Sequence, residues 1–125
     1  MGGCHCGRLR FEVDGAPDQV IECNCSVCTR KGYLHWIVPR ERFRLVSGAD
    51  DLATYRVGSG VAQHHFCREC GVASFYVPRS HPDGIDVDVR CLDDVDVRTL
   101  PRRPFDGRNR ESAVTDLRRE PGGGA

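Results

Sequence analysis

Seven of the eight cysteines in this chain of 125 residues stand in three short clusters. The clusters are a pair at Cys4 and Cys6, a group of three at Cys23, Cys25 and Cys28, and a second pair at Cys67 and Cys70. Cysteines one or two residues apart can direct both sulfurs to one ion, and a tetrahedral zinc site with Zn–S bonds of ~2.3 Å requires that closeness. The spacing therefore predicts metal binding through sulfur, with zinc as the metal.

The number of ligands divides these cysteines into a set of four and a set of three. The two pairs complete one tetrahedral Cys₄ site, which links the start of the chain to its middle and so stabilises the fold. Gly71, directly after Cys70, lets the backbone turn tightly around such an ion. This site is predicted to be structural, because a tetrahedron filled by four protein ligands has no place for a substrate.

The middle cluster leaves one position of its ion without a cysteine. Three thiolates give the complex a net negative charge, so the ion polarises water less well than a three-histidine site but still accepts another soft thiolate. A thiol held there would be deprotonated and positioned next to an electrophile. The structural alternative is that a histidine or a water completes a second inert site, and the spacing alone leaves both interpretations open.

Disulfides are the competing interpretation, because a small secreted scaffold is also rich in cysteine. A secretory signal would need an apolar run of roughly 7–15 residues near the start, and the first residues, Met1–Gly7, do not form one. No apolar stretch approaches the ~20 residues of a membrane-spanning helix. We therefore expect a cytoplasmic protein with reduced, metal-binding cysteines and no membrane partner.

The remaining cysteine, Cys91, continues an apolar series on one face of a predicted strand, after Ile85, Val87 and Val89. A free cysteine behaves there as a small hydrophobic residue. Core packing is therefore the favoured role of Cys91, and ligation of the second ion is the alternative.

Histidines are the further candidates for acid–base chemistry near neutral pH. The chain has five of them: His5, His35, His64, His65 and His81. His5 and His64 lie close in sequence to cysteines of the set of four, and we expect each of them only to orient that shell.

The elements that position these residues follow a hydrophobic period of two, which is typical of half-buried strands. The predicted strands are Arg8–Val13, Gln19–Asn24, Tyr33–Val38, Phe43–Ser47, Ala53–Val57, Gln63–Cys67, Ala73–Val77 and a strand through Ile85–Cys91. One helical turn is predicted at Pro39–Arg42, and a short helix at Ser112–Glu120. The fold class is mainly β: a single small domain of antiparallel strands over residues 1–120, clipped by the Cys₄ site and followed by a flexible tail at 121–125.

The charge balance narrows the class of partner. Eighteen basic residues offset 18 acidic ones, whereas a general nucleic-acid binder normally shows a basic excess. A small-molecule thiol or thiol adduct is therefore the expected partner, and nucleic acid is not.

Three segments in this order resemble the glutathione-dependent formaldehyde-activating enzyme family: Gly3–Gly7 with Arg10–Val13, Cys23–Cys28, and Phe66–Gly71. The resemblance implies a mainly β zinc domain with two ions. The structural ion would lie at Cys4, Cys6, Cys67 and Cys70, and the catalytic ion at Cys23, Cys25 and Cys28. It also implies an activity that joins glutathione and formaldehyde into S-hydroxymethylglutathione, formally a carbon–sulfur lyase reaction run in reverse.

Two hypotheses about function follow. In the first, the chain is a carbon–sulfur lyase-type enzyme whose second ion takes the thiol of glutathione or a related molecule, while arginine side chains engage its carboxylates. In the second, both ions are structural and the surface binds protein or chromatin, as the centromere-associated vertebrate member of the family suggests. The open ligand position and the neutral charge favour the enzyme.

Overall fold

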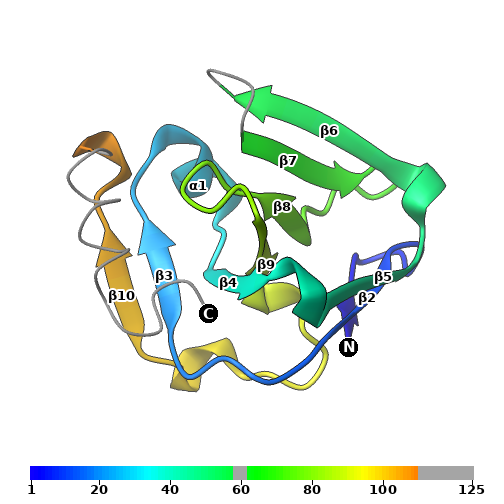
Figure 1. Ribbon diagram of the computed structural model, residues 1–125, viewed down its shortest axis with the longest axis horizontal. Helices are drawn as coiled ribbons and strands as arrows, with labels where there is room; N and C mark the ends of the chain where they lie inside the picture. The colour runs from blue at the N-terminus through cyan, green and yellow to red at the C-terminus, as the bar shows by residue number, and fades with distance from the viewer. Residues whose placement is uncertain (58–61, 110–125) are drawn as a thin grey trace.

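Two β-sheets share one hydrophobic core, and strands from distant parts of the sequence lie next to each other in them (Figure 1). The structure is a computed structural model that describes residues 1–57 and 62–109. The smaller sheet has the order β1-β2-β5 and the larger sheet the order β10-β3-β4-β9-β8-β7-β6. Neighbouring strands are antiparallel except for β10 and β3, which run parallel.

The elements are short, as expected for strands separated by turn residues. The strands are β1 (Gly2–Gly3), β2 (Arg10–Val13), β3 (Val20–Cys23), β4 (His35–Pro39), β5 (Phe43–Ser47), β6 (Leu52–Val57), β7 (Ala62–Cys67), β8 (Phe75–Val77), β9 (Gly84–Asp88) and β10 (Arg102–Phe105). The α-helix is α1 (Ser26–Lys31), and the 3₁₀ turns are η1 (Arg40–Arg42), η2 (Ala49–Asp51), η3 (Val89–Cys91), η4 (Val97–Thr99) and η5 (Gly107–Asn109).

Alternate residues of the larger sheet face the core. Trp36 and Val38 of β4 and Val87 of β9 belong to one buried cluster, to which the smaller sheet contributes Phe11. The ring of Phe11 packs edge-on against that of Phe75 in β8, with centroids 6.2 Å apart. Because burial of one such side chain stabilises a fold by about 1.5–3 kcal/mol, this cluster is what holds the two sheets together.

The intervening residues of the same strands are mostly polar and lie on the opposite face of the larger sheet. Tyr76 of β8 pairs with Asp86 of β9, and His64 of β7 pairs with Tyr76. Asp86 also pairs with Ile37 of β4, which is two residues along from His35. Because side chains alternate across a strand, these residues share one face. That face is buried at its centre, where His35 is 4% exposed and Asp86 is 1% exposed.

The prediction of a single, mainly β domain is confirmed. The predicted strand Phe43–Ser47 coincides with β5, and the predicted turn at Pro39–Arg42 contains η1. The predicted strand through Cys91 ends earlier, because the side chain of Asp88 accepts a hydrogen bond from the Arg90 amide at 3.1 Å and so begins η3.

The helix α1 and the strands β1 and β10 were not predicted. The predicted helix at 112–120, the predicted tail at 121–125 and the predicted domain limit at residue 120 lie outside the described residues. Within the described ranges, no helix has the length and apolar character that crossing a membrane requires.

Candidate metal centres and the adjoining pocket

The first cysteine cluster joins the start of the chain to the end of β7. The sulfurs of Cys4, Cys6, Cys67 and Cys70 all lie within 4.8 Å of one another. The Cys4 and Cys6 sulfurs are 3.6 Å apart, and those of Cys6 and Cys67 are 3.7 Å apart. A disulfide would need about 2.05 Å, whereas four sulfurs at ~2.3 Å from one zinc ion stand about 3.8 Å from each other. The donor set and its spacing therefore fit zinc.

Backbone hydrogen bonds shape this cluster. The Gly71 amide donates to the Cys67 carbonyl at 2.8 Å, and Gly71 takes the left-handed conformation (φ 76°) that closes the turn. The Leu9 amide donates to the Cys4 sulfur at 3.3 Å. Burial alone would raise the pKa of Cys70, but backbone N–H groups and the neighbouring thiols lower it to about 6. Cys70 therefore favours the thiolate, the form that binds metal. Backbone N–H groups lower the pKa of Cys67, but burial and the neighbouring thiols outweigh them and raise it to about 11.

The second cluster lies where β3 passes into α1. Cys23 ends β3, Cys25 is the N-cap of α1, and Cys28 lies in its first turn. The three sulfurs lie within 4.8 Å of one another. The Cys25 amide donates to the Cys23 sulfur and the Cys28 amide donates to the Cys25 sulfur, each at 3.4 Å. The cap of a short helix thus turns all three sulfurs toward one point.

The electrostatics of this cluster suit a soft cation. The hydrogen bond from the Cys28 thiol lowers the pKa of Cys23 to about 5, and the Cys25 amide adds to that effect while burial opposes it. The same pairing with Cys23, together with burial, raises the pKa of Cys28. Cys23 and Cys28 therefore share one negative charge without a metal, and a divalent ion would displace the proton that they share. These residues fit zinc with one position left for another ligand.

The chain closes over the second cluster at Gly107, in the segment that follows β10. A Cβ at Gly107 would stand 2.7 Å from the Cys23 sulfur and 2.8 Å from the Cys25 Cβ, so only glycine fits there. Asn24 secures this segment, because its side-chain amide donates to Asp106 at 3.0 Å and its side-chain oxygen accepts from the Arg108 amide at 3.2 Å.

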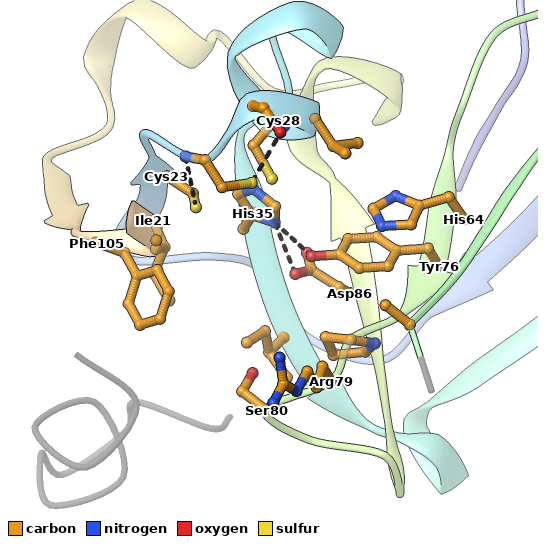
Figure 2. A pocket seen from close by; sticks show the side chains of 17 residues that line it. Ile21, Cys23, Cys28, His35, His64, Tyr76, Arg79, Ser80, Asp86 and Phe105 are labelled. Carbon is orange, nitrogen blue, oxygen red and sulfur yellow. Dashed lines mark hydrogen bonds and ion pairs between the residues drawn. The ribbon is translucent and has the colours of Figure 1, made fainter. Parts of the chain in front are cut away.

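A cavity of about 200 Å³ lies beside the three sulfurs, on the polar face of the larger sheet (Figure 2). His35, Tyr76 and Asp86 form part of its wall. Arg79 also lines it, and in Figure 2 its guanidinium lies across the cavity from Cys28. The second cluster therefore faces a cavity, which the sequence analysis did not predict.

A buried pair, His35 and Asp86, forms the wall next to the cysteines. The Nδ1 atom of His35 is 2.7 Å from Oδ2 of Asp86, and the Tyr76 hydroxyl is 3.4 Å from the same nitrogen. Burial lowers the pKa of His35, but the charge and hydrogen bond of Asp86 outweigh it, so the pKa is raised overall. Among the described residues, neither Nε2 of His35 nor Oδ1 of Asp86 has a hydrogen-bond partner. Buried polar atoms are rarely left unpaired, so these two need an explanation.

A second row of polar residues supports this wall. Lys31 Nζ is 3.0 Å from Nδ1 of His64, and it also lies over the rings of Tyr33 and Tyr76. The imidazole of His64 stacks on Tyr76 with ring centroids 4.3 Å apart. Burial and then the charge of Lys31 lower the pKa of His64 to about 4, so His64 is neutral and its Nδ1 accepts a hydrogen bond from Lys31 Nζ. These contacts fix the orientation of Tyr76.

The structure brings the seven predicted cysteines together as the predicted sets of four and three. Cys91 belongs to neither set and packs against the core, where burial raises its pKa to about 11. His64 does not orient the Cys₄ shell as expected, because it lines the cavity of the second cluster instead. Sequence reasoning did not single out Asp86, Tyr76, Arg79 or Gly107. The only signal for Asp86 was its place opposite the apolar face of a strand.

The chain is similar to known proteins over most of its length. The sequence profile of the family described as glutathione-dependent formaldehyde-activating enzyme matches residues 1–105, which include all seven clustered cysteines. A Halomonas elongata protein, provisionally named a glutathione-dependent formaldehyde-activating enzyme, is 27% identical over 112 residues, or 82% of this chain and 69% of that protein. A Rhodobacter sphaeroides protein of known crystal structure is similar with a TM-score of 0.74 and 34% identity, over 82% of this chain and 98% of that one.

Proposed function

The chain belongs to the glutathione-dependent formaldehyde-activating enzyme family, and from this membership we propose that it is a zinc-dependent enzyme of the carbon–sulfur lyase type. It forms or cleaves the bond between a thiol, such as glutathione, and a small aldehyde, with S-hydroxymethylglutathione as the adduct. We propose two zinc ions per chain, one structural and one catalytic, and a cytoplasmic location, where glutathione is reduced. The observation that carries the proposal is the three-cysteine cluster that faces a cavity.

The surroundings of the two clusters support different roles for their ions. Cys4 and Cys67 are buried against Leu9 in a small apolar cluster of their own. Cys23, Cys25 and Cys28 line the cavity with three ligands. A zinc ion held by these three would supply an open coordination position that favours a thiol sulfur and lowers its pKa.

The size of the cavity limits what it can enclose. A volume of about 200 Å³ is smaller than the ~300–1,000 Å³ of pockets that bury whole drug-sized ligands. It therefore suits the sulfur-bearing arm of a thiol together with a small aldehyde, while the rest of the thiol lies at the mouth. Arg79 lines the cavity and is exposed, and no hydrogen bond or ion pair joins its guanidinium to another described residue. It is positioned to take a carboxylate of the thiol.

Cobalt substitution tests whether the second cluster takes a thiol through its sulfur. Glutathione added to the Co²⁺ protein should intensify the sulfur-to-metal charge-transfer absorption, because a fourth sulfur joins three others. S-methylglutathione should have little effect, since it keeps the carboxylates but has no ionisable thiol. A Cys25→Ser variant should lose the response, whereas Cys91→Ala, which alters a cysteine outside both clusters, should keep it.

The reaction itself is tested by following the adduct of glutathione and formaldehyde with zinc-loaded protein. Wild type and Cys91→Ala should speed the approach to equilibrium from both directions, and Cys25→Ser should not. If S-methylglutathione perturbs cobalt as strongly as glutathione does, direct sulfur binding is wrong. If no thiol acts in either assay, the alternative of a non-catalytic interaction module becomes the better interpretation.

A further inference from the structure

The cavity contains one buried nitrogen whose bonding capacity is unused. Nε2 of His35 has no hydrogen-bond partner among the described residues, although His35 is only 4% exposed. His35 lines the cavity and lies between Cys28 and Asp86 (Figure 2). A buried nitrogen without a partner destabilises the fold, so a partner from a bound molecule would remove that penalty.

The partner of the other ring nitrogen determines what Nε2 can do. A carboxylate can only accept hydrogen bonds, so Asp86 Oδ2, at 2.7 Å from Nδ1, requires a proton on Nδ1. At a pH above the raised pKa of His35 the ring is neutral, and Nε2 then carries a lone pair and no proton. The Tyr33 hydroxyl donates to the Asp86 backbone carbonyl at 2.6 Å, which helps to hold Asp86 in place. The cavity therefore presents a fixed proton acceptor.

Direct ligation of the second ion is a different use of that lone pair, and the distances do not favour it. Among the described residues, no histidine nitrogen lies within 4.8 Å of all three sulfurs of Cys23, Cys25 and Cys28. In a tetrahedral site, a nitrogen ligand would stand about 3.6 Å from each sulfur. His35 thus lies in the wall of the same cavity as the three cysteines without joining their ligand set.

We propose that Nε2 of His35 takes the proton of the incoming thiol and returns it to the oxygen of the aldehyde. This inference rests on the proposed function. The S–H bond breaks as Nε2 gains its proton. The sulfur then forms a bond to the aldehyde carbon, the C=O π electrons move to oxygen, and Nε2–H protonates that oxygen. The reverse sequence releases the aldehyde, so no other reactant is needed and His35 ends as it began. Asp86 is the positioning residue, because it selects the tautomer.

The number of protons released on thiol binding tests this role without turnover. Glutathione binding to the zinc protein is measured calorimetrically at about pH 8, where a free thiol is still mostly protonated, in buffers of different ionisation enthalpy. Wild type should release almost no proton, because His35 retains it. His35→Gln should release about one proton per glutathione bound. The matched control His65→Gln should behave as wild type, since His65 lies on the opposite face of β7 and contacts Thr54 at 2.9 Å.

A measurement on the wild type keeps the proposal testable if the variant does not fold. Nitrogen NMR of labelled histidine should show Nε2 of His35 unprotonated in the zinc protein and protonated once glutathione binds, with no change for S-methylglutathione. Glutathione binding that leaves Nε2 unprotonated, or one released proton in wild type, overturns the role of His35 and leaves the proposed function standing. A change in the cobalt spectrum of His35→Gln before any thiol is added would instead make His35 a ligand. If no thiol binds at all, both proposals fail.

Discussion

Single residues at the second cluster combine metal binding with local structure. Cys25 caps α1 through its sulfur, which accepts the Cys28 amide at 3.4 Å, and the same sulfur belongs to the set of three. Its geometry therefore depends on the backbone of this turn more than on other side chains. Small changes that crowd the backbone should alter the metal site and leave the sheet intact.

Gly107→Ala is the smallest such change. The added Cβ would meet the Cys23 sulfur at 2.7 Å, so either the segment after β10 or the cysteine must move. We expect the affinity of the second site for zinc to fall about 10–100-fold, the range seen when residues around metal ligands are changed. Competition with a chromophoric chelator should show one weakened site and one unchanged site. Equal weakening of both would contradict the assignment of Gly107 to the second cluster.

Arg79→Ala separates recognition of the carboxylate from recognition of the sulfur. A charge-assisted hydrogen bond contributes about 1.5–3 kcal/mol, so the KM for glutathione should rise roughly 10–100-fold. The KM for 2-mercaptoethanol, which has no carboxylate, should hardly change. Arg98→Ala is the control, because Arg98 is an exposed residue paired with Asp96. An equal effect on both thiols would mean that Arg79 has a structural role.

At the scale of elements, hydrophobic patterning identified β2 to β9 but not how these strands are paired. The alternation of Ile85 and Val87 with Asp86 and Asp88 marked β9, yet only the register with β4 brings Asp86 to His35. Register depends on partners that one strand does not encode by itself. The His35–Asp86 pair therefore could not be predicted from the sequence, whereas the cysteine spacing is local and predicts both clusters.

The two missed elements at the site lack a usable pattern. α1 has six residues, too few for a helical period to appear, although Gly32 after Arg30 and Lys31 was a signal for a helix end. β10 contains Arg102, Arg103 and Pro104 before its one buried residue, Phe105. Charged residues and proline are tolerated in it because it is an edge strand.

The junction of β9 and η3 should make stability depend on pH. Burial raises the pKa of Asp88 to about 6 from its ordinary 3.8. A carboxyl group with a raised pKa supports folding fully below its ordinary pKa, and that support is lost as the pH rises through about 6. Asp88→Asn keeps the acceptor for the Leu34 and Arg90 amides without the charge.

We therefore expect Asp88→Asn to be more stable than wild type at pH above about 6, by on the order of 1–3 kcal/mol. Thermal melts at several pH values should show this difference narrowing as the pH falls through about 6. Acid releases zinc from both proteins. The prediction therefore concerns the difference in stability between Asp88→Asn and wild type at each pH. Asp93→Asn is the control. Its stability difference from wild type should have the opposite sign, because Arg10 lowers the pKa of Asp93. A constant difference at every pH would contradict the prediction.

For the whole molecule, the two clusters differ in what they join. The first cluster links the chain before β2 to the end of β7, and so connects the smaller sheet to the larger one. The second lies within the short connection between β3 and α1. Loss of the first site should therefore disconnect sheets, whereas loss of the second should loosen one edge.

Cys67→Ser should unfold the protein or lower its Tm severely, because Cys67 is fully buried and zinc binding of ~10–16 kcal/mol is comparable to the whole stability of a small domain, about 5–15 kcal/mol. Cys25→Ser should give a folded protein with one zinc ion. Circular dichroism melts together with metal analysis would distinguish the two variants. Damage in the reverse order would mean that the roles of the sites are exchanged.

The closure of the second cluster by Gly107 also bears on how the protein is made. During synthesis Cys23, Cys25 and Cys28 leave the ribosome early, and every ligand of the first site has emerged once Cys70 has. β10, which pairs with β3 from Val20 to Cys23, emerges after all seven of these cysteines. A nascent chain can therefore load both ions before β10 docks. Once β10 has docked, the cavity is an open side from which a metal chaperone, or a chelator, can approach the second ion.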